Sequence, residues 1–462
     1  MLAKFKKKYI GDWDFYQKYL LLAIPMILQN AITNLVSFLD NIMVGQLGTE
    51  QMSGVAIVNQ LIFVYNLAIF GAVSAASIFG AQYFGKGNHK GHMYSFRFKL
   101  YATLLVTGGA ILLFLTKGSA LISLYLTDTV GNGATDLALQ YGLEYLAIMM
   151  VGLIPFAVNQ SYATNIKETG QTFIPMLASF VAVGTNALLD YLMIFGIGPF
   201  PELGVQGAAL ATVIARYIEA LIVVIWAHIH RGKNRYLEGA YTGFGIPLAE
   251  LKAILIKGFP LMMNEVLWAA GMTTVTQCYS VRGLDVVAGL NIASTITNLF
   301  NIVYLQLGSC ISIVVGQYLG AGKLEDAKDA DNKMIVFSVF CCVIMAALMF
   351  VVGGFFPGIY NTTEEIRELA TSFIAVSAII MPFCAFSHAS YFTLRSGGKT
   401  VVTFLFDSVF TWVIVVPAAY LLAHFTGLGI VGIYFLVQGT ELIKVIIGYL
   451  MVKSNVWVVQ MV

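Results

Sequence analysis

The chain has 462 residues, of which 58% are hydrophobic and only 11% charged, with a formal net charge of +2 and a mean hydropathy of +0.81. An average soluble domain carries about 25% charged residues, and nucleic-acid-binding proteins are usually strongly basic, so the composition argues against both classes. Continuous apolar runs of about 20 residues also exclude a β-barrel, whose strands alternate over about ten residues. The sequence therefore predicts an all-α polytopic membrane protein.

The apolar runs predict twelve membrane-spanning helices. They lie near residues 19–45, 51–80, 93–116, 137–163, 172–195, 207–229, 251–280, 286–318, 334–355, 369–393, 400–424 and 429–452. Most of the 26 Lys and Arg residues then fall on one side, so the positive-inside rule predicts that both termini are cytoplasmic. The basic amino-terminal stretch precedes a full-length span, so we expect it to be retained and not cleaved as a signal peptide.

The first predicted span contains Pro25 and a single charged residue, Asp40. A lone carboxylate in a membrane helix costs roughly 2.5–3.5 kcal/mol on insertion scales, so it is usually functional. Because this span runs outward and ends near Gly45, Asp40 is expected about 8 Å below the outer surface.

Polar residues of the fifth and sixth predicted spans lie at the same level as Asp40. Asp190 and Asn186, one turn apart, belong to the fifth span, and Thr212 belongs to the sixth. Two carboxylates with amide and hydroxyl oxygens suit proton uptake, and they also suit Na⁺, a hard cation that prefers oxygen ligands. Hydrogen bonding between helices is the alternative role for isolated Asn and Thr residues. We expect a cation site here.

The two halves of the sequence repeat each other. Three motif pairs match: GAQYFGKG (80–87) with VGQYLGAG (315–322), TGQT (169–172) with GGKT (397–400), and LGVQG (203–207) with LGIVG (428–432). The first offset also carries Pro25 onto Pro260. These matches predict two six-helix lobes, residues 1–229 and 251–462, joined by a cytoplasmic linker at 230–250. Because both lobes start on the same side, a pseudo-two-fold axis along the membrane normal would relate them.

The carboxyl-terminal half offers a second candidate site. Glu265 in the seventh span, His388 in the tenth and Asp407 in the eleventh are all expected in the inner half of the membrane. They could bind a proton or substrate, mostly through Glu265. A lone histidine near the end of a span is otherwise a packing residue.

Charged pairs also occur in the sixth and twelfth spans. Arg216 and Glu219 map onto Glu441 and Lys444 with the order of sign reversed. Each pair is spaced i, i+3, so each could neutralise itself along its own helix and make insertion tolerable. The alternative is pairing between the lobes that latches one access state.

Several motifs together resemble the multidrug and toxic compound extrusion (MATE) family over about residues 15–452. They are P-x14-D across the first span followed by VGQLG, SIFGAQYFGKGN after the second span, NALLDYLMIFG in the fifth and GAALAT opening the sixth. The resemblance is closer to the proton-coupled DinF-like branch than to the sodium-coupled NorM branch. It implies an inner-membrane antiporter that exports organic, often cationic, compounds in exchange for inward H⁺ or Na⁺.

The resemblance also implies roles for single residues. It places the cation site on Asp40, Asn186, Asp190 and Thr212, and it implies that the helix containing Pro25 bends there when the site is protonated. The glutamate of the seventh span in this family falls where this chain has Trp268, and the tenth span has no aspartate. A sodium site in the second lobe is therefore not expected.

Other functions remain as alternatives. A flippase for lipid-linked saccharides or lipids, from the same superfamily, is the nearest one. A polytopic membrane enzyme is disfavoured because the chain has no HExxH, GxSxG or P-loop motif. A passive channel would not need buried acids in one lobe. The expected partners are a small organic substrate and the lipid bilayer, without nucleic acid. We expect a monomer with no cofactor and no metal other than a transported Na⁺.

Overall fold

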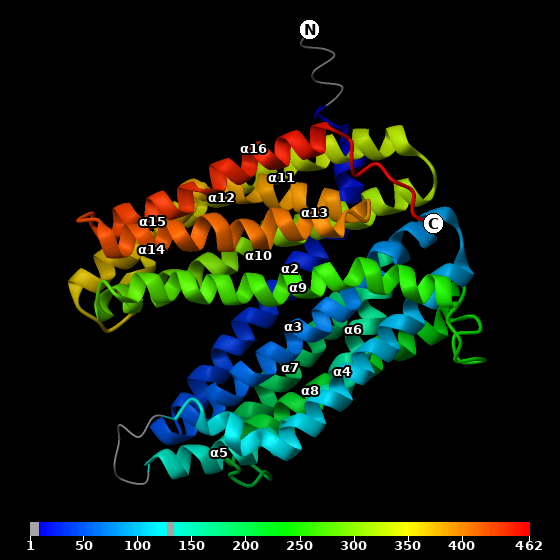
Figure 1. The fold of residues 1–462 in the computed structure, drawn as a ribbon. Helices are drawn as coiled ribbons and strands as arrows, with labels where there is room; N and C mark the ends of the chain where they lie inside the picture. The colour runs from blue at the N-terminus through cyan, green and yellow to red at the C-terminus, as the bar shows by residue number, and fades with distance from the viewer. Residues whose placement is uncertain (1–8, 127–133) are drawn as a thin grey trace. The chain divides into compact units, whose positions relative to one another are not determined.

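All regular elements in the described residues are helices. The structure is a computed structural model, and it describes residues 9–126 and 134–462 (Figure 1). The amino-terminal half contains α2 (Trp13–Gly45), α3 (Thr49–Lys86), α4 (His89–Ser123), α5 (Ala134–Met149), α6 (Leu153–Glu168), α7 (Phe173–Ile194), α8 (Val205–Ile229) and the short η1 (Arg235–Leu237). A bilayer offers no hydrogen-bond partners to the backbone, so apolar segments of this length satisfy their N–H and C=O groups as helices.

The carboxyl-terminal half follows the same order. It contains α9 (Leu248–Ser280), α10 (Leu284–Gly320), α11 (Leu324–Gly353), η2 (Phe356–Ile359), α12 (Glu364–Ser396), α13 (Thr400–Phe404), η3 (Leu405–Val409), η4 (Thr411–Val415), α14 (Val416–Phe425), α15 (Ile430–Gly439) and α16 (Glu441–Lys453). Among the described residues, 11 helices are long and apolar enough to cross a membrane, and counting one bent pair as a span brings the number to 12. The predicted all-α polytopic fold class is confirmed.

Two spans depart from a straight α-helix. The fourth span is broken between α5 and α6, which meet at an angle of 48° near Gly152. The eleventh span runs from α13 to α14 through η3 and η4, which are both π-helical. Stretches of π-helix insert an extra residue per turn and often occur at functional sites. Neither irregularity was expected from the sequence.

The internal repeat is visible in the backbone of single residues. Gly87 and Gly322, which the repeat aligns, end α3 and α10 with φ of +74° and +73°. Gly48 and Gly283, also aligned, precede the same two helices with φ of +144° and +128°. Residues other than glycine rarely adopt these positive φ values. Equivalent glycines therefore form the turns before and after α3 and α10.

The described chain forms two compact units. One comprises the described residues through Ala23, Ala81–Asn88 and Lys252–Val462, and the other comprises Ile24–Gly80 and His89–Leu251. These units do not follow the predicted lobes residue for residue, because the first part of α2 and the last part of α3 pack with the carboxyl-terminal half. The lobe boundaries at 229 and 251 stay a prediction.

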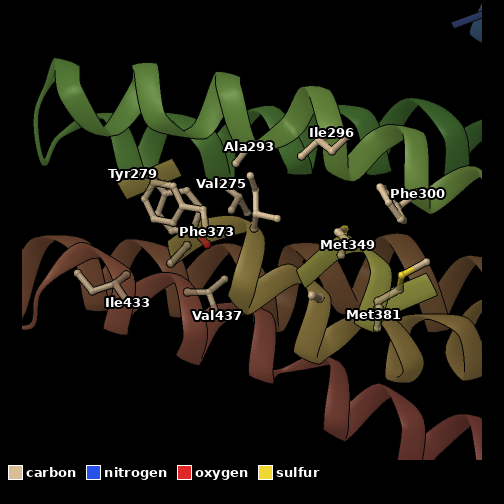
Figure 2. Close-up of a cluster of buried hydrophobic side chains, with 14 of the residues drawn as sticks. Val275, Tyr279, Ala293, Ile296, Phe300, Met349, Phe373, Met381, Ile433 and Val437 are labelled. Carbon is tan, nitrogen blue, oxygen red and sulfur yellow. The ribbon is translucent and has the colours of Figure 1, made fainter. Parts of the chain in front are cut away.

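Each unit has its own apolar core. In the unit that contains Lys252–Val462, residues from α9, α10, α11, α12, α14 and α15 interdigitate, and Figure 2 shows Tyr279, Phe373 and Val437 among them. In the other unit a cluster with residues from each helix between α2 and α8 includes Val58, Ile122 and Ala209, each fully buried.

The end of α3 and the end of α10 cross at very short range. A Cβ atom added at Gly85 would overlap the carbonyl of Gln317, and one added at Gly320 would overlap the carbonyl of Gln82. The repeat aligns Gln82 with Gln317 and Gly85 with Gly320. The contact is therefore reciprocal, and both glycines are required for the close approach.

The last residues of the chain pack beside this crossing. The side chain of Gln82 donates to the carbonyl of Val459 over 3.2 Å and accepts from the N–H of Met461 over 2.8 Å. The indole of Trp457 is 1% exposed. The segment after α16 is thus an ordered part of its unit.

The segment after α8 is held by one arginine of α4. The Arg97 guanidinium donates to the carbonyls of Gly239, Ala240 and Gly245 over 2.6, 2.9 and 2.7 Å. Three bonds from one planar group to three backbone carbonyls fix this loop against α4. The predicted linker at 230–250 is therefore packed on its own unit over much of its length.

Candidate functional site

The carboxyl groups of Asp40 and Asp190 lie next to each other. Asp40 comes from α2, fifteen residues after Pro25 in the sequence, and Asp190 comes from α7 and is 1% exposed. Two carboxyl groups at this range repel each other when both are ionised. The pair is therefore built to hold a proton or another small cation.

Two further side chains complete the cluster predicted from the sequence. Asn186 donates from Nδ2 to Oδ2 of Asp190 over 2.9 Å, and the same amide lies 3.5 Å from Oγ1 of Thr212 on α8. The helical spacing of Asn186 and Asp190 puts both on the face of α7 that meets α8. The structure thus brings the four predicted residues of this half together.

Two buried oxygen atoms of the pair have no donor. Oδ1 of Asp40 and Oδ1 of Asp190 are both buried and without a hydrogen-bond partner in the described part of the chain. An unpaired buried acceptor costs about 1–3 kcal/mol, and more when it is charged. Both atoms are hard oxygen ligands, so a bound proton or Na⁺ would give them the partner that they lack.

A tyrosine of α5 lies beside the pair and was missed from the sequence. Tyr145 interacts electrostatically with both Asp40 and Asp190, and its hydroxyl donates to Oδ1 of Asn59 over 3.3 Å. Its only sequence signal is a position in the fourth predicted span, where an aromatic residue is ordinary. The pair thus has a phenol and an amide close to it.

The candidate residues of the carboxyl-terminal half are arranged differently from the prediction. Asp407, in the π-helical η3, accepts from Nζ of Lys444 over 2.7 Å and from Nδ2 of Asn264 over 3.0 Å. Both carboxylate oxygens therefore have partners, and an ion pair neutralises the charge. Asn264 and Lys444, which the sequence analysis did not assign to this site, are the residues that contact Asp407.

Glu265 and His388 do not join this network by hydrogen bonds within the described residues. Glu265 follows Asn264 on α9 and interacts with Asp407 only through space. His388 bonds through Nδ1 with the carbonyl of Cys384 over 2.9 Å, and its ring packs 4.7 Å from that of Tyr304. Its contacts are those of a packing residue.

The charged pairs predicted within the sixth and twelfth spans do not form as ion pairs in the described structure. Arg216 points toward the carbonyl of Gly152, 3.4 Å away at the break between α5 and α6, and its guanidinium lies over the ring of Phe156. Lys444 pairs with Asp407 and not with Glu441. Each pair interacts only through space along its own helix, so its role in neutralising the span stays a prediction.

A buried charge cluster in the amino-terminal half was also missed. Nζ of Lys99 lies 2.5 Å from Oε1 of Glu168 and also bonds with Asn165, and Nε2 of His92 lies 3.3 Å from Oε2 of Glu168. Lys99 and Glu168 flank inner loops in the sequence, where charges normally face water. Only the structure shows that α4 and α6 bury them.

Comparison with known proteins decides the family. A protein-family model described as MatE matches residues 25–192 and again residues 260–421. The chain belongs to the MatE family. The two matched ranges begin at Pro25 and Pro260, so the family pattern itself follows the internal repeat.

Individual MatE relatives cover nearly the whole chain. The "Probable multidrug resistance protein NorM" of Thermotoga maritima is 24% identical over 413 residues, 89% of this chain and 86% of the relative. The solved structures of a MOP superfamily transporter from Pyrococcus furiosus and of a multidrug resistance MATE family transporter in an outward-facing conformation each align with a TM-score of 0.85, 20% identity and 96% coverage of both chains. These structures share the fold.

Membership of the MatE family establishes the general class of activity. MATE proteins are multidrug efflux transporters and not enzymes, so the predicted transporter class is confirmed. The spans and the bacterial relatives identify a multi-pass protein of the inner membrane. The assignment to the DinF-like branch stays a prediction.

Proposed function

We propose that this MATE protein is a secondary active antiporter that exports small organic compounds in exchange for inward H⁺ or Na⁺ bound at Asp40 and Asp190. The observation that carries the proposal is the close approach of these two carboxyl groups, each of which has a buried oxygen without a hydrogen-bond partner in the described residues. No pair of acids in the described part of the other half has this arrangement, since Asp407 is neutralised by Lys444.

Electrostatics explains why the pair would hold a cation. Two unit charges 4 Å apart interact by about 4 kcal/mol at the effective dielectric constant of a protein near its surface. Two carboxylates in contact therefore repel each other strongly, and one H⁺ or Na⁺ removes that repulsion. Asn186 and Thr212 supply neutral polar atoms at the same place.

An antiporter also needs a site whose charge differs between its two half-cycles. When the acid pair is occupied by the coupling ion, an organic cation loses its electrostatic attraction to the site. When the pair is empty, the cation is attracted. Each ligand thus shifts the population between access states by its differential affinity.

Pro25 supplies a point where α2 can change shape. It lies inside α2 and has no N–H for the i to i−4 helical bond, so bending there costs less than elsewhere. We propose that neutralising Asp40, on the same helix, favours bending near Pro25. The cytoplasmic location of both termini and the monomeric state belong to this proposal as well.

The test is transport in proteoliposomes under separately imposed pH and sodium gradients, with ethidium as the fluorescent organic cation. One of the two gradients should drive ethidium movement in the wild type, and Asp40→Asn or Asp190→Asn should abolish it. Glu365→Gln removes an exposed acid and serves as the matched control. Normal gradient-driven transport by both aspartate variants would refute the site, and transfer of a fluorescent lipid without ethidium transport would favour the flippase.

A further inference from the structure

Each half of the chain has a polar amide four residues after its helix proline. Gln29 follows Pro25 on α2, and its Nε2 donates to Oγ of Ser179 on α7 over 2.7 Å. Asn264 follows Pro260 on α9, and its Nδ2 donates to Oδ2 of Asp407 over 3.0 Å. In each half a hydrogen bond thus connects the proline-containing helix to the fifth span, one turn after the proline.

A third side chain, from the sixth span of each half, extends both connections. The hydroxyl of Ser179 donates to Oε1 of Glu219 on α8. Nζ of Lys444 on α16 donates to Oδ1 of Asp407 over 2.7 Å. We name Gln29, Ser179 and Glu219 the N-half triad, and Asn264, Asp407 and Lys444 the C-half triad.

The two triads occupy equivalent positions of the repeat. The offset that carries Pro25 onto Pro260 carries Gln29 onto Asn264. The offset that aligns TGQT with GGKT carries Ser179 onto Asp407, and the one that aligns LGVQG with LGIVG carries Glu219 onto Lys444. Three separate alignments agree, so both triads are one structural device with different side chains.

The triads differ in charge. In the C-half triad the carboxylate and the ammonium neutralise each other. In the N-half triad the carboxylate of Glu219 is bonded by Ser179 and Asn159, which are neutral. The basic residues that interact electrostatically with Glu219 are Lys167 on α6 and Arg216 on α8. Arg216 contacts the carbonyl of Gly152, and Glu219 is in no ion pair among the described residues.

The N-half triad also lacks a hydrogen-bond donor. Oε1 of Gln29 and Oδ1 of Asn159 are both buried and unpaired within the described structure. A buried acceptor without a donor costs about 1–3 kcal/mol. The carboxylic acid form of Glu219 would bring one O–H to this place, whereas the carboxylate brings none.

We propose that Glu219 is a second proton-exchanging group of the amino-terminal half and that its protonation loosens the attachment of α2 to α7. In the ionised state, Gln29 donates to Ser179 and Ser179 donates to the carboxylate, a charge-assisted bond that is roughly twice as strong as a neutral one. A proton added to Oε1 or Oε2 of Glu219 forms an O–H group. This group can donate to Ser179 or to Gln29, and it then competes with the hydrogen bond between those two residues. No other covalent bond forms or breaks in this step.

The first test is infrared spectroscopy of the purified protein in lipid vesicles over a pH series. The C=O stretching band of protonated carboxyl groups should lose one titrating component in Glu219→Gln. The double variant Ser179→Asp/Glu219→Lys, which installs the side-chain types of the C-half triad, should lose the same component. Asp190→Asn should remove a different component and leave this one. An identical titrating band in the wild type and in Glu219→Gln would overturn the proposal.

The second test measures hydrogen exchange of the backbone in the α2 segment after Pro25. After correction for the intrinsic pH dependence, exchange in the wild type should be several-fold faster at the pH where the Glu219 component is protonated. In Glu219→Gln the corrected rates should not depend on pH. An equal pH effect in both proteins would show that Glu219 does not control α2. Neither readout requires transport, so this outcome is independent of the coupling role proposed for Asp40 and Asp190.

Discussion

Asn186 donates a hydrogen bond to Asp190 one helical turn away on α7, with Nδ2 2.9 Å from Oδ2. A donor at this place favours the ionised carboxylate over the carboxylic acid. The same amide carries a carbonyl oxygen, which is a suitable ligand for Na⁺. Asn186 therefore acts in opposite directions on the two coupling ions.

This opposition gives a prediction for Asn186→Ala. A hydrogen bond to a charged group is worth about 1.5–3 kcal/mol, which corresponds to a change in affinity of about tenfold or more. If the coupling ion is H⁺, the variant should bind it about tenfold more tightly and become saturated at higher pH. If the ion is Na⁺, half-maximal transport should need about tenfold more of it.

The measurement is the pH series and the sodium series of ethidium transport in proteoliposomes. Thr212→Val is the comparison, because its hydroxyl lies at the limit of hydrogen bonding, 3.5 Å from the amide, and its effect should be smaller. An unchanged ion dependence in Asn186→Ala would remove this residue from the site.

A second prediction concerns the buried ion pair of the carboxyl-terminal half. Lys444→Met leaves the Asp407 carboxylate without its cation and should destabilise the protein by about 3–5 kcal/mol. The double variant Lys444→Met/Asp407→Asn should regain most of the loss. Thermal unfolding in detergent micelles measures both. Lys328→Met, which breaks an exposed pair with Glu325, should cost less than about 1 kcal/mol. Equal losses in the single and double variants would contradict the role of the pair.

A third prediction tests the crossing of α3 and α10. Gly320→Ala places a Cβ on the carbonyl of Gln82 and should cost about 1–3 kcal/mol by overpacking. Gly184→Ala in α7 meets nothing within 4 Å, so it should be neutral or stabilise by up to about 1 kcal/mol. Unfolding temperatures in the same detergent compare the two. Equal behaviour would mean that the crossing is looser than the structure shows.

A fourth prediction concerns the loop held by Arg97. Arg97→Ala removes three bonds to the carbonyls of Gly239, Ala240 and Gly245, so chymotrypsin should cut after Tyr241 or Phe244 several-fold faster. The control is Arg235→Ala, whose exposed side chain contacts Glu238 at 3.4 Å and His89 at 3.1 Å but none of these three carbonyls. If both variants are cut at the wild-type rate, another contact holds the loop.

Much of the fold could be predicted because single helices in a membrane are decided locally. Length and apolar composition predict each span, and aligned glycines such as Gly87 and Gly322 predict matching turns. Asp40 and Asp190 could be placed at one level because the rise per residue converts sequence position into depth. Their direct contact required the packing of α2 against α7.

The contacts that could not be predicted from the sequence share a different physical cause. Lys444 pairs with Asp407 and Arg216 contacts the carbonyl of Gly152, and both partners belong to other segments of the chain. Sequence spacing describes neighbours along a helix but not across helices. Lys99 lies inside the third predicted span and Glu168 follows the fourth, and only the packing of α4 against α6 shows that they are buried together.

The reciprocal crossing of Gly85 with Gln317 and Gly320 with Gln82 has the form of an isologous interface, the kind that joins two identical subunits about a two-fold axis. In such an interface one substitution appears twice, so a single harmful change in an ancestral homodimer would damage both contacts at once. In this chain the two copies can change separately. Evolution could thus give Asp407 and Lys444 to one copy and Ser179 and Glu219 to the other while the two-fold contact stayed the same.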